Sequence, residues 1–366
     1  MRSILLTILC AVSIALISCS DEQGPQTDSF DRAEMLRSIS DRLIIPAYTS
    51  AEESLDSLAV FYDEAIADGL LSTAEIDVLR ARVATTTLRW QRIVTFNFGP
   101  AEGDLGTVAQ EVSTFPCDTA AIEARISTSD TVFTDFRRDT RGLAALDYLV
   151  FATTSTETAQ RLSGPAAQGR RQYLRAVIMH ARSAIVGVAT SWRSQYRDVF
   201  CSRTGTDAGS SVSLLFNEMN KSFELLKNFK LGLPLGLRAG QTASEPTKIE
   251  AYYSGRSYEL IGLHFHSIKE IWSGKLSDGT VIPSFRDYLL TVVNGPRLVE
   301  DTEAQIARID AAYLTISQSQ MDVLIRTNPQ ALMLLHTEMQ KLTRFIKSEM
   351  SSLLGISITY SSGDGD

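Results

Sequence analysis

The stretch RRQYLRAVIMHARSAIVGVATSW, residues 170–192, shows most clearly which kind of fold this chain adopts. Its apolar residues recur mainly at intervals of three, four and seven positions, which places them on one face of an α-helix. Polar and charged residues fill most of the remaining positions. The pattern therefore predicts an amphipathic helix that packs one side against a core. The residues that define this apolar face are Leu174, Val177, Ile178, Ile185, Val188 and Trp192.

The same helical periodicity continues on both sides of this stretch. One helix is predicted to begin at Ser72, because Ser72 and Glu75 have the spacing of a capping box. A last long helix is predicted to begin at Asn328 and Pro329, with the asparagine as its N-cap. Strand patterns are weak, since the alternating residues 356–360 are few and terminal. We therefore predict an all-α fold of two helical-bundle halves, with few or no strands.

A segment rich in Gly, Ser and Thr, residues 201–211, separates two long helical regions. The chain has 366 residues, 44% of them hydrophobic, and chains of this size usually divide into two units. We predict an N-terminal bundle over residues 31–200 and a C-terminal bundle over residues 211–366. The two bundles together are expected to form one domain.

The charge balance bears on possible partners. The chain carries 35 Lys and Arg residues against 43 Asp and Glu residues, a formal net charge of −8, and no long basic run. An acidic surface repels the phosphate backbone of nucleic acids. Nucleic acid is therefore not expected as a partner.

The N-terminus resembles the export signal of a bacterial lipoprotein. Arg2 precedes the apolar residues 4–17, which are too few to span a bilayer comfortably but are typical of a signal peptide. This run ends in the sequence LISC, which resembles a lipobox. We predict a signal peptide over residues 1–18, lipidation of Cys19 and a tether over residues 19–30; an uncleaved anchor helix is the alternative. The chain is then expected in the cell envelope, held to the outer membrane by its lipid and facing the periplasm or the cell surface.

Two further cysteines remain in the chain after Cys10 and Cys19. Cys117 and Cys201 would lie in an oxidising compartment, where a disulfide can persist. A disulfide between them is possible, although the sequence does not place their Cα atoms within bonding range. No spacing of Cys and His residues fits a zinc site.

The four histidines form no local catalytic or metal-binding motif. His264 and His266 are two residues apart, so a helix would place them on opposite faces. His180 and His336 flank the apolar faces of their helices and are expected at the surface or at its edge. The motifs HExxH and GxSxG and the phosphate-binding loop are absent from the sequence, so local patterns alone identify no enzyme.

The sequence RGLAALDYLVF, residues 141–151, places a single carboxylate inside an apolar helix. Such a helix should be largely buried, and a buried Asp147 needs a partner for its charge. Arg137, Arg138 and Arg141 are close in sequence, so an internal ion pair is expected. A ligand-binding site is the alternative interpretation.

The stretch 141–151 resembles a helix of the imelysin-like family, in which Gly is followed by His-x-x-Glu and then YLL. Other segments resemble the family in the same order along the chain, which makes the resemblance specific. It implies an envelope protein of two helical halves with a site between them. The family is named for a metallopeptidase and includes proteins linked to periplasmic iron uptake. The other segments are LIIPAYTSAEESLDSL (43–58), LRWQRIVTFNFGPAE (88–102), FPCDTAAIEARI (115–126), LLKNFKLGLPLG (225–236), KIEAYYSGRSYELI (248–261) and LLGISITYSSGDGD (353–366).

This chain departs from the family at the positions of the metal ligands. The family His falls on Ala144, the family Glu on Asp147, and a further Glu on a Trp-containing helix falls on Val94. A divalent ion needs three or four ligands, and one aspartate supplies at most two oxygens. The resemblance therefore implies a degenerate metal or ligand site at Val94, Gly142, Ala144 and Asp147, without metallopeptidase activity.

We therefore predict a non-enzymatic envelope protein linked to iron acquisition. It would bind a ligand, or a protein of envelope iron uptake, between its two halves. The alternative is an iron-binding protein or metallopeptidase that holds iron or zinc through non-standard ligands. The residues expected to contact the cleft are Arg141, Tyr148, Lys230, Glu250, Asp364 and Asp366.

Overall fold

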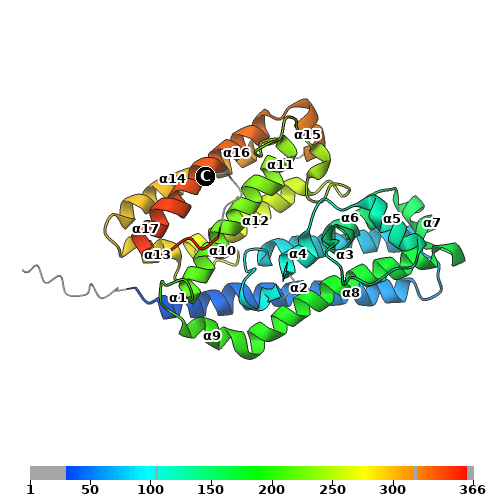
Figure 1. Cartoon of the computed structure of the whole chain (residues 1–366), viewed down its shortest axis with the longest axis horizontal. Coiled ribbons are helices and arrows are strands. Elements are labelled where there is room, and N and C mark those ends of the chain that lie inside the picture. The colour runs from blue at the N-terminus through cyan, green and yellow to red at the C-terminus, as the bar shows by residue number, and fades with distance from the viewer. Residues whose placement is uncertain (1–29, 104–105, 317–319, 361–366) are drawn as a thin grey trace, which may run out of the picture.

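The structure is a computed structural model that describes residues 30–103, 106–316 and 320–360. Within these ranges the chain is almost entirely helical, which confirms the predicted all-α class. Figure 1 shows two groups of helices, α1–α9 and α10–α17, side by side along the long axis of the molecule. The predicted signal peptide, Cys19, most of the tether, Asp364 and Asp366 lie outside the described residues.

The N-terminal helix group is built around three long helices, in which α2 packs against both α3 and α8. Its strands form one two-residue antiparallel pair, in which Glu102 lies opposite Thr107. The bounds of its elements are α1 Arg32–Ile39, α2 Ile45–Ala65, α3 Thr73–Ile93, β1 Glu102–Gly103, β2 Gly106–Thr107, α4 Val108–Ser113, α5 Thr119–Ser127, α6 Gly142–Phe151, α7 Ser155–Leu162, α8 Gln168–Ser191 and α9 Arg197–Ser202.

The C-terminal helix group packs α14 against α16, and α12 faces α3 of the N-terminal group. Figure 1 shows α10 and α12 on the side of this group that faces the other one. The bounds of its helices are α10 Ser211–Leu225, α11 Leu233–Leu235, α12 Ser257–Ser273, α13 Phe285–Leu290, α14 Gly295–Leu314, α15 Met321–Thr327, α16 Gln330–Thr343 and α17 Ser351–Leu354.

Local signals in the sequence place several helix ends. Ser72 accepts a hydrogen bond from the Glu75 backbone, and the Glu75 side chain accepts one from the Ser72 backbone, so the predicted capping box is confirmed. Helix α16 begins one residue later than predicted, because Pro329 rather than Asn328 takes the N-cap position. Residues 356–360 pair with no strand among the described residues.

Four helices continue into π-helical turns, which have one more residue per hydrogen-bonded ring than an α-helix. Residues 170–192 show such a transition. Helix α8 buries the predicted apolar face, and a π-helical turn then begins at Trp192. A π-turn changes which residues face the core beyond it. The π-helical segments are η1 Ser40–Ile44, η5 Trp192–Tyr196, η6 Leu226–Gly232 and η8 Arg344–Met350; short 3₁₀ turns are η2 Gly99–Ala101, η3 Arg138–Thr140, η4 Pro165–Ala167 and η7 Pro246–Lys248.

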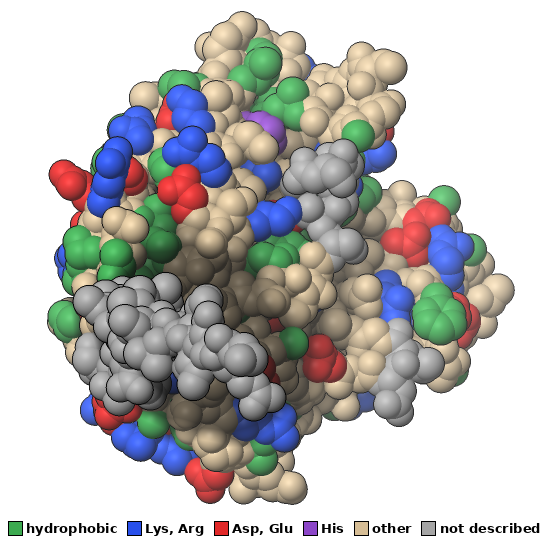
Figure 2. All heavy atoms as spheres, turned by 60° about the vertical axis from the view of Figure 1, so that its left-hand side comes forward, with side chains coloured by type: hydrophobic (Ala, Val, Ile, Leu, Met, Phe, Trp, Pro, Cys, Tyr) green, Lys and Arg blue, Asp and Glu red, His purple; other side chains and the backbone are tan. Residues whose placement is uncertain are grey.

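The buried apolar residues of both helix groups form one continuous core. Cys117 and Cys201 are both free in this structure, so the possible disulfide is not formed there. Among the described residues, no helix combines the length and the hydropathy that crossing a bilayer requires. On the face seen in Figure 2, basic and acidic side chains are interspersed.

Candidate functional site

The two helix groups meet along a surface that we call the seam. Helix α3 and the residues after it lie on one side of the seam, and α10, η6 and α12 lie on the other. The seam contains buried polar side chains as well as apolar ones, including Gln91, Lys230 and Glu250. Buried polar groups require partners, so their contacts show which parts of the seam are fixed by the protein itself.

Gly142 fixes the position of helix α6 beside the seam. It has φ +75°, and a Cβ atom there would lie 2.4 Å from the carbonyl oxygen of Val112. Only glycine meets both conditions without strain, so α6 can begin in close contact with α4. This start places Ala144 and Asp147 toward the turn at residues 249–255, because residues three apart share a helix face.

Asp147 binds the backbone of the other helix group. Its side chain is buried, with 6% of the residue exposed. Asp147 Oδ2 accepts a hydrogen bond from the Tyr253 backbone N–H at 2.8 Å, and Oδ1 accepts one from the Ser254 backbone N–H at 3.2 Å. The carboxylate therefore joins the two helix groups across the seam.

The predicted ion pair between Asp147 and a nearby arginine is wrong. Arg138 and Arg141 both donate to Glu111, at 2.7 Å each, and Arg137 pairs with Asp118 and Asp139. These arginines precede α6, whereas Asp147 lies more than a turn into it. Proximity in sequence therefore did not become proximity in space.

The turn that Asp147 holds has an unusual backbone. Ala251 has φ 55° and Gly255 has φ 70°, so both lie in the left-handed region. For Ala251 this conformation carries strain, because its Cβ crowds the backbone. The Ser257 hydroxyl donates to the Glu250 carbonyl and closes the turn on its other side. The turn thus presents two backbone N–H groups to one carboxylate.

Burial changes the proton affinity of this carboxyl group. Burial raises the pKa of Asp147 to about 6, since the charged form loses hydration. The hydrogen bonds from residues 253 and 254 lower it, and the charge of Glu250 raises it. Near neutral pH the group is mainly ionised and accepts both backbone hydrogen bonds.

A second buried link lies beside the first. Lys230 Nζ is 2.8 Å from Glu250 Oε2, and both side chains are nearly inaccessible. Gln91, from the N-terminal helix group, accepts from Lys230 at 2.5 Å and donates to Glu250 at 3.1 Å. Burial lowers the pKa of Lys230, and the adjacent Glu250 opposes that shift. The three side chains form one buried polar cluster inside the seam.

A third link is a chain of hydroxyl and imidazole groups that the sequence did not indicate. Thr95 Oγ1 lies 2.9 Å from Ser222 Oγ, which lies 2.6 Å from His264 Nε2. His264 is fully buried and His266 is partly exposed, which is consistent with opposite helix faces. Burial lowers the pKa of His264 well below its usual value, so the imidazole is neutral at pH 7.

The structure brings together only some of the predicted cleft residues. Lys230 and Glu250 lie at the seam, where they pair with each other. Tyr148 donates to Glu123 at 2.6 Å, and its ring also packs against that of Tyr253 across the seam, with the ring centroids 5.3 Å apart. Arg141 pairs with Glu111 within the N-terminal helix group. Val94 lines a different cavity from Ala144 and Asp147.

Three cavities follow the seam, and Phe115 lines all of them. The largest, which we call the seam cavity, has a volume of about 520 Å³. A space of about 10 Å³ and another of about 290 Å³ lie beside Ala144 and Asp147. The seam cavity is lined by Val94, Asn97, Thr107, Ala109, Gln110, Ser113, Thr114, Phe115, Glu218, Lys221, Ser222, Glu224, Leu225, Asn228, Phe229 and Tyr360.

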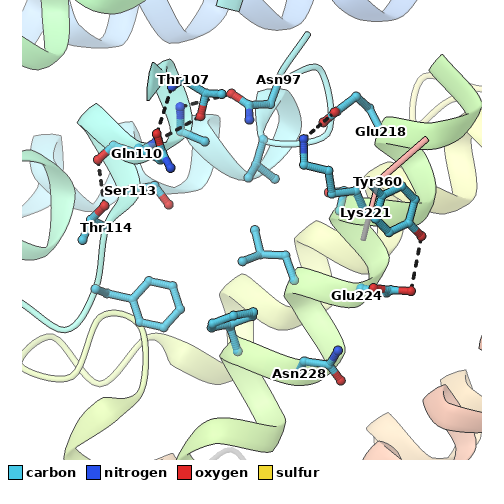
Figure 3. Close-up of a pocket in the computed structure, with 16 residues that line it drawn as sticks. Asn97, Thr107, Gln110, Ser113, Thr114, Glu218, Lys221, Glu224, Asn228 and Tyr360 are labelled. Atoms are coloured by element: carbon cyan, nitrogen blue, oxygen red, sulfur yellow. Dashed lines mark hydrogen bonds and ion pairs between the residues drawn. The ribbon is translucent and has the colours of Figure 1, made fainter. Parts of the chain in front are cut away.

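Figure 3 shows polar side chains on both walls of the seam cavity. Asn97, Gln110 and Ser113 come from the N-terminal helix group, and Glu218 and Asn228 come from α10 and η6. Burial raises the pKa of Glu218, while its ion pair with the adjacent lysine opposes that shift. Sequence reasoning missed this set, because its members are far apart in the chain and form no local motif.

The residues at the family's metal positions do not fit a metal ion. Val94 and Ala144 have no donor atom, and both Asp147 oxygens accept backbone hydrogen bonds. Among the described residues, no three His, Cys, Asp or Glu side chains are grouped closely enough to hold an ion. Backbone N–H groups thus stand where a cation would have to approach this carboxylate.

The imelysin family model matches residues 44–348, so the chain belongs to the imelysin family. A comparison with curated proteins found no match.

Two solved structures have similar folds. An imelysin-like protein from Psychrobacter arcticum 273-4 matches with a TM-score of 0.68 and 17% identity, over 90% of this chain and 97% of that one. A protein named as an iron-regulated protein A precursor, from Parabacteroides distasonis ATCC 8503, matches with a TM-score of 0.71 and 17% identity, over 88% of this chain and 95% of that one. At this identity the comparison establishes the fold.

Proposed function

We propose that this chain is a lipid-anchored, non-enzymatic protein of the cell envelope that binds a small organic ligand in the seam cavity as part of iron acquisition. The observation that carries the proposal is the seam cavity itself, whose volume of about 520 Å³ is within the range of small-molecule sites. Polar groups from both helix groups line it, together with apolar ones. Such a lining suits an organic molecule better than a bare ion.

Family membership and one structural neighbour support the link to iron. The chain matches the imelysin family over most of its length, and one protein of similar fold is named as iron-regulated. The metal positions of the family pattern hold Val94, Ala144 and an Asp147 that is already bonded. A role in binding an iron chelate or an envelope iron-uptake protein therefore fits this chain better than peptide hydrolysis at a bound metal.

The first experiment separates bare-metal binding from chelate binding. The purified chain is titrated calorimetrically with ferrous iron under anaerobic conditions, with zinc, and with ferric citrate as a small organic iron chelate. The Val94→Glu, Ala144→His double variant and the cavity-filling Ala109→Trp variant are titrated in parallel. We expect the wild type to bind neither ion, to bind the chelate, and to lose the chelate in the Ala109→Trp variant.

Two other outcomes would overturn parts of this proposal. Micromolar binding of either ion by the wild type would favour a metal protein with non-standard ligands. Unaltered chelate binding in the Ala109→Trp variant would exclude the seam cavity as its site. Metal binding gained by the double variant would support the assignment of Val94 and Ala144 to former ligand positions.

The lipid anchor is tested separately in cells. Metabolic labelling with a radioactive fatty acid should label the wild type and fail to label a Cys19→Ser variant. Labelled protein should sediment with outer membranes, and protease added to intact cells reports whether it faces outward. Equal labelling of both forms would refute lipidation at Cys19.

A further inference from the structure

Another cavity lies in the C-terminal helix group, where the segment after η6 meets α16. It has a volume of about 270 Å³, and we call it the Arg238 cavity. Part of its wall comes from η6, and π-helical turns occur often at functional sites. The cavity is lined by Asn228, Gly232, Leu237, Arg238, Ala239, His336 and Gln340.

Arg238 is the principal charged group of this cavity. Its guanidinium carbon lies 3.9 Å from the centre of the Phe229 ring, so the aromatic ring supports its planar head. Among the described residues, no carboxylate forms an ion pair with this guanidinium. A supported guanidinium without a carboxylate partner can donate two parallel hydrogen bonds to an oxyanion.

Helix α16 supplies two further polar groups. His336 and Gln340 are four residues apart and therefore share a face of the helix. A Cβ atom on Gly232 would lie 3.1 Å from His336 Nε2, which is tighter than an ordinary contact. The glycine thus leaves room for the imidazole beside η6, and both α16 side chains line the same space as Arg238.

The composition of the lining selects the charge of a ligand. Among the described residues, no Asp or Glu lines the Arg238 cavity, whereas a guanidinium, an imidazole and two side-chain amides do. In a partly enclosed space these groups favour an anion over a cation or an apolar group. We propose that the Arg238 cavity is a binding site for an oxyanion, the phosphate or carboxylate group of a small ligand.

This site does not depend on the proposed function, although the two cavities adjoin. Asn228 lines both cavities, and Phe229 lines the seam cavity while it supports Arg238. An anion bound in the Arg238 cavity would therefore lie next to residues that also form one wall of the seam cavity. The oxyanion site stands even if the seam cavity binds nothing.

The test uses two simple anions and matched charge variants. The purified chain is titrated calorimetrically with inorganic phosphate and, separately, with succinate, at constant ionic strength. We expect saturable binding of at least one anion, weakened at least tenfold in the Arg238→Gln variant and severalfold in the His336→Gln variant. The control is Arg344→Gln, which removes a largely exposed arginine that does not line this cavity.

The titrations distinguish the preferred anion from an absence of binding. Phosphate alone or succinate alone identifies the oxyanion that the cavity prefers. No saturable heat with either anion, or equal weakening in the Arg344→Gln control, would overturn the proposal. Thermal melting of each variant shows whether a loss of binding reflects unfolding. The Ala109→Trp variant should keep anion binding, so this result is independent of the seam cavity.

Discussion

Two neighbouring parts of the seam differ in how their polar groups are satisfied. Around Asp147 and Lys230, the protein's own backbone and side chains occupy the hydrogen-bonding positions. Around Asn97 and Glu218, polar side chains from both helix groups border a cavity of about 520 Å³. The difference indicates that the first part holds the helix groups together and that the second is available to a ligand.

The largest effect is expected for Lys230→Met. This change leaves Glu250 charged and buried without its cation, and breaking a buried pair costs about 3–5 kcal/mol of unfolding free energy. Urea denaturation monitored by circular dichroism measures the loss. The Lys230→Met, Glu250→Leu double variant removes both charges and should lose less than the single variant. If the single variant loses under about 1 kcal/mol, the pair is not structural.

Asp147→Ala should destabilise the protein by about 3 kcal/mol, because two backbone N–H groups at the turn lose their acceptor. Asp147→Asn keeps one acceptor oxygen and removes a buried charge, so it should lose only about 1 kcal/mol. The same urea experiment measures both variants. Asp198→Ala, at a highly exposed carboxylate, is the control. Equal losses in the Ala and Asn variants would show that the hydrogen bonds do not matter.

The pH dependence of stability gives a third test. The pKa of Asp147 is raised in the folded state, so ionisation of this group reduces the stability of the protein above about pH 6. This loss of stability disappears as the pH falls toward about 4, the pKa of an aspartate in the unfolded chain. His264 has the opposite effect on stability. Because its pKa is lowered in the folded state, the unfolded chain binds the proton at a higher pH, and the protein loses stability as the pH falls. The contribution of Asp147 must therefore be measured as a difference between variants.

From pH 7 to pH 4.5, the stability of the wild type relative to the Asp147→Asn variant should rise by about 2 kcal/mol. Urea denaturation at both pH values measures this difference, and the His264 contribution cancels because both proteins contain it. A difference that does not change with pH would mean that Asp147 has an ordinary pKa. It would also remove the argument that its carboxyl group is strongly desolvated.

The smallest effect is expected at the seam cavity. Ser113 lines it, and its hydroxyl forms no hydrogen bond with any of the described residues. Ser113→Ala should therefore change the unfolding free energy by less than about 0.5 kcal/mol, as substitutions away from structural contacts do. Denaturation under the conditions used for Lys230→Met measures it. A loss above about 1 kcal/mol would show that this part of the seam is structural as well.

The features that could be predicted from the sequence are those set by neighbouring residues. The capping box at Ser72 and the apolar face of residues 170–192 depend on spacing alone, and the structure confirms both. The all-α class follows from many such patterns, since each helix requires only local periodicity. The family resemblance is confirmed by the match over residues 44–348.

The features that could not be predicted depend on distant segments. Asp147 was expected to pair with an arginine a few residues away, but its partners are more than 100 residues away in the sequence. Lys230 and Glu250 were expected to contact the cleft, but not to neutralise each other. Whether a buried charge faces a ligand or the protein itself depends on tertiary packing, which local patterns do not encode.

The π-helical segment η6 couples the two parts of the seam through helix register. Ser222 precedes η6 and lines the seam cavity, whereas Lys230 lies within η6 and reaches Glu250. Deleting one residue between them would let the helix return to an α-helical repeat and turn every later side chain by about 100°. Lys230 would then leave its partner while Ser222 stayed in place. The number of residues in this segment therefore determines which side chains reach the seam, just as their identity does.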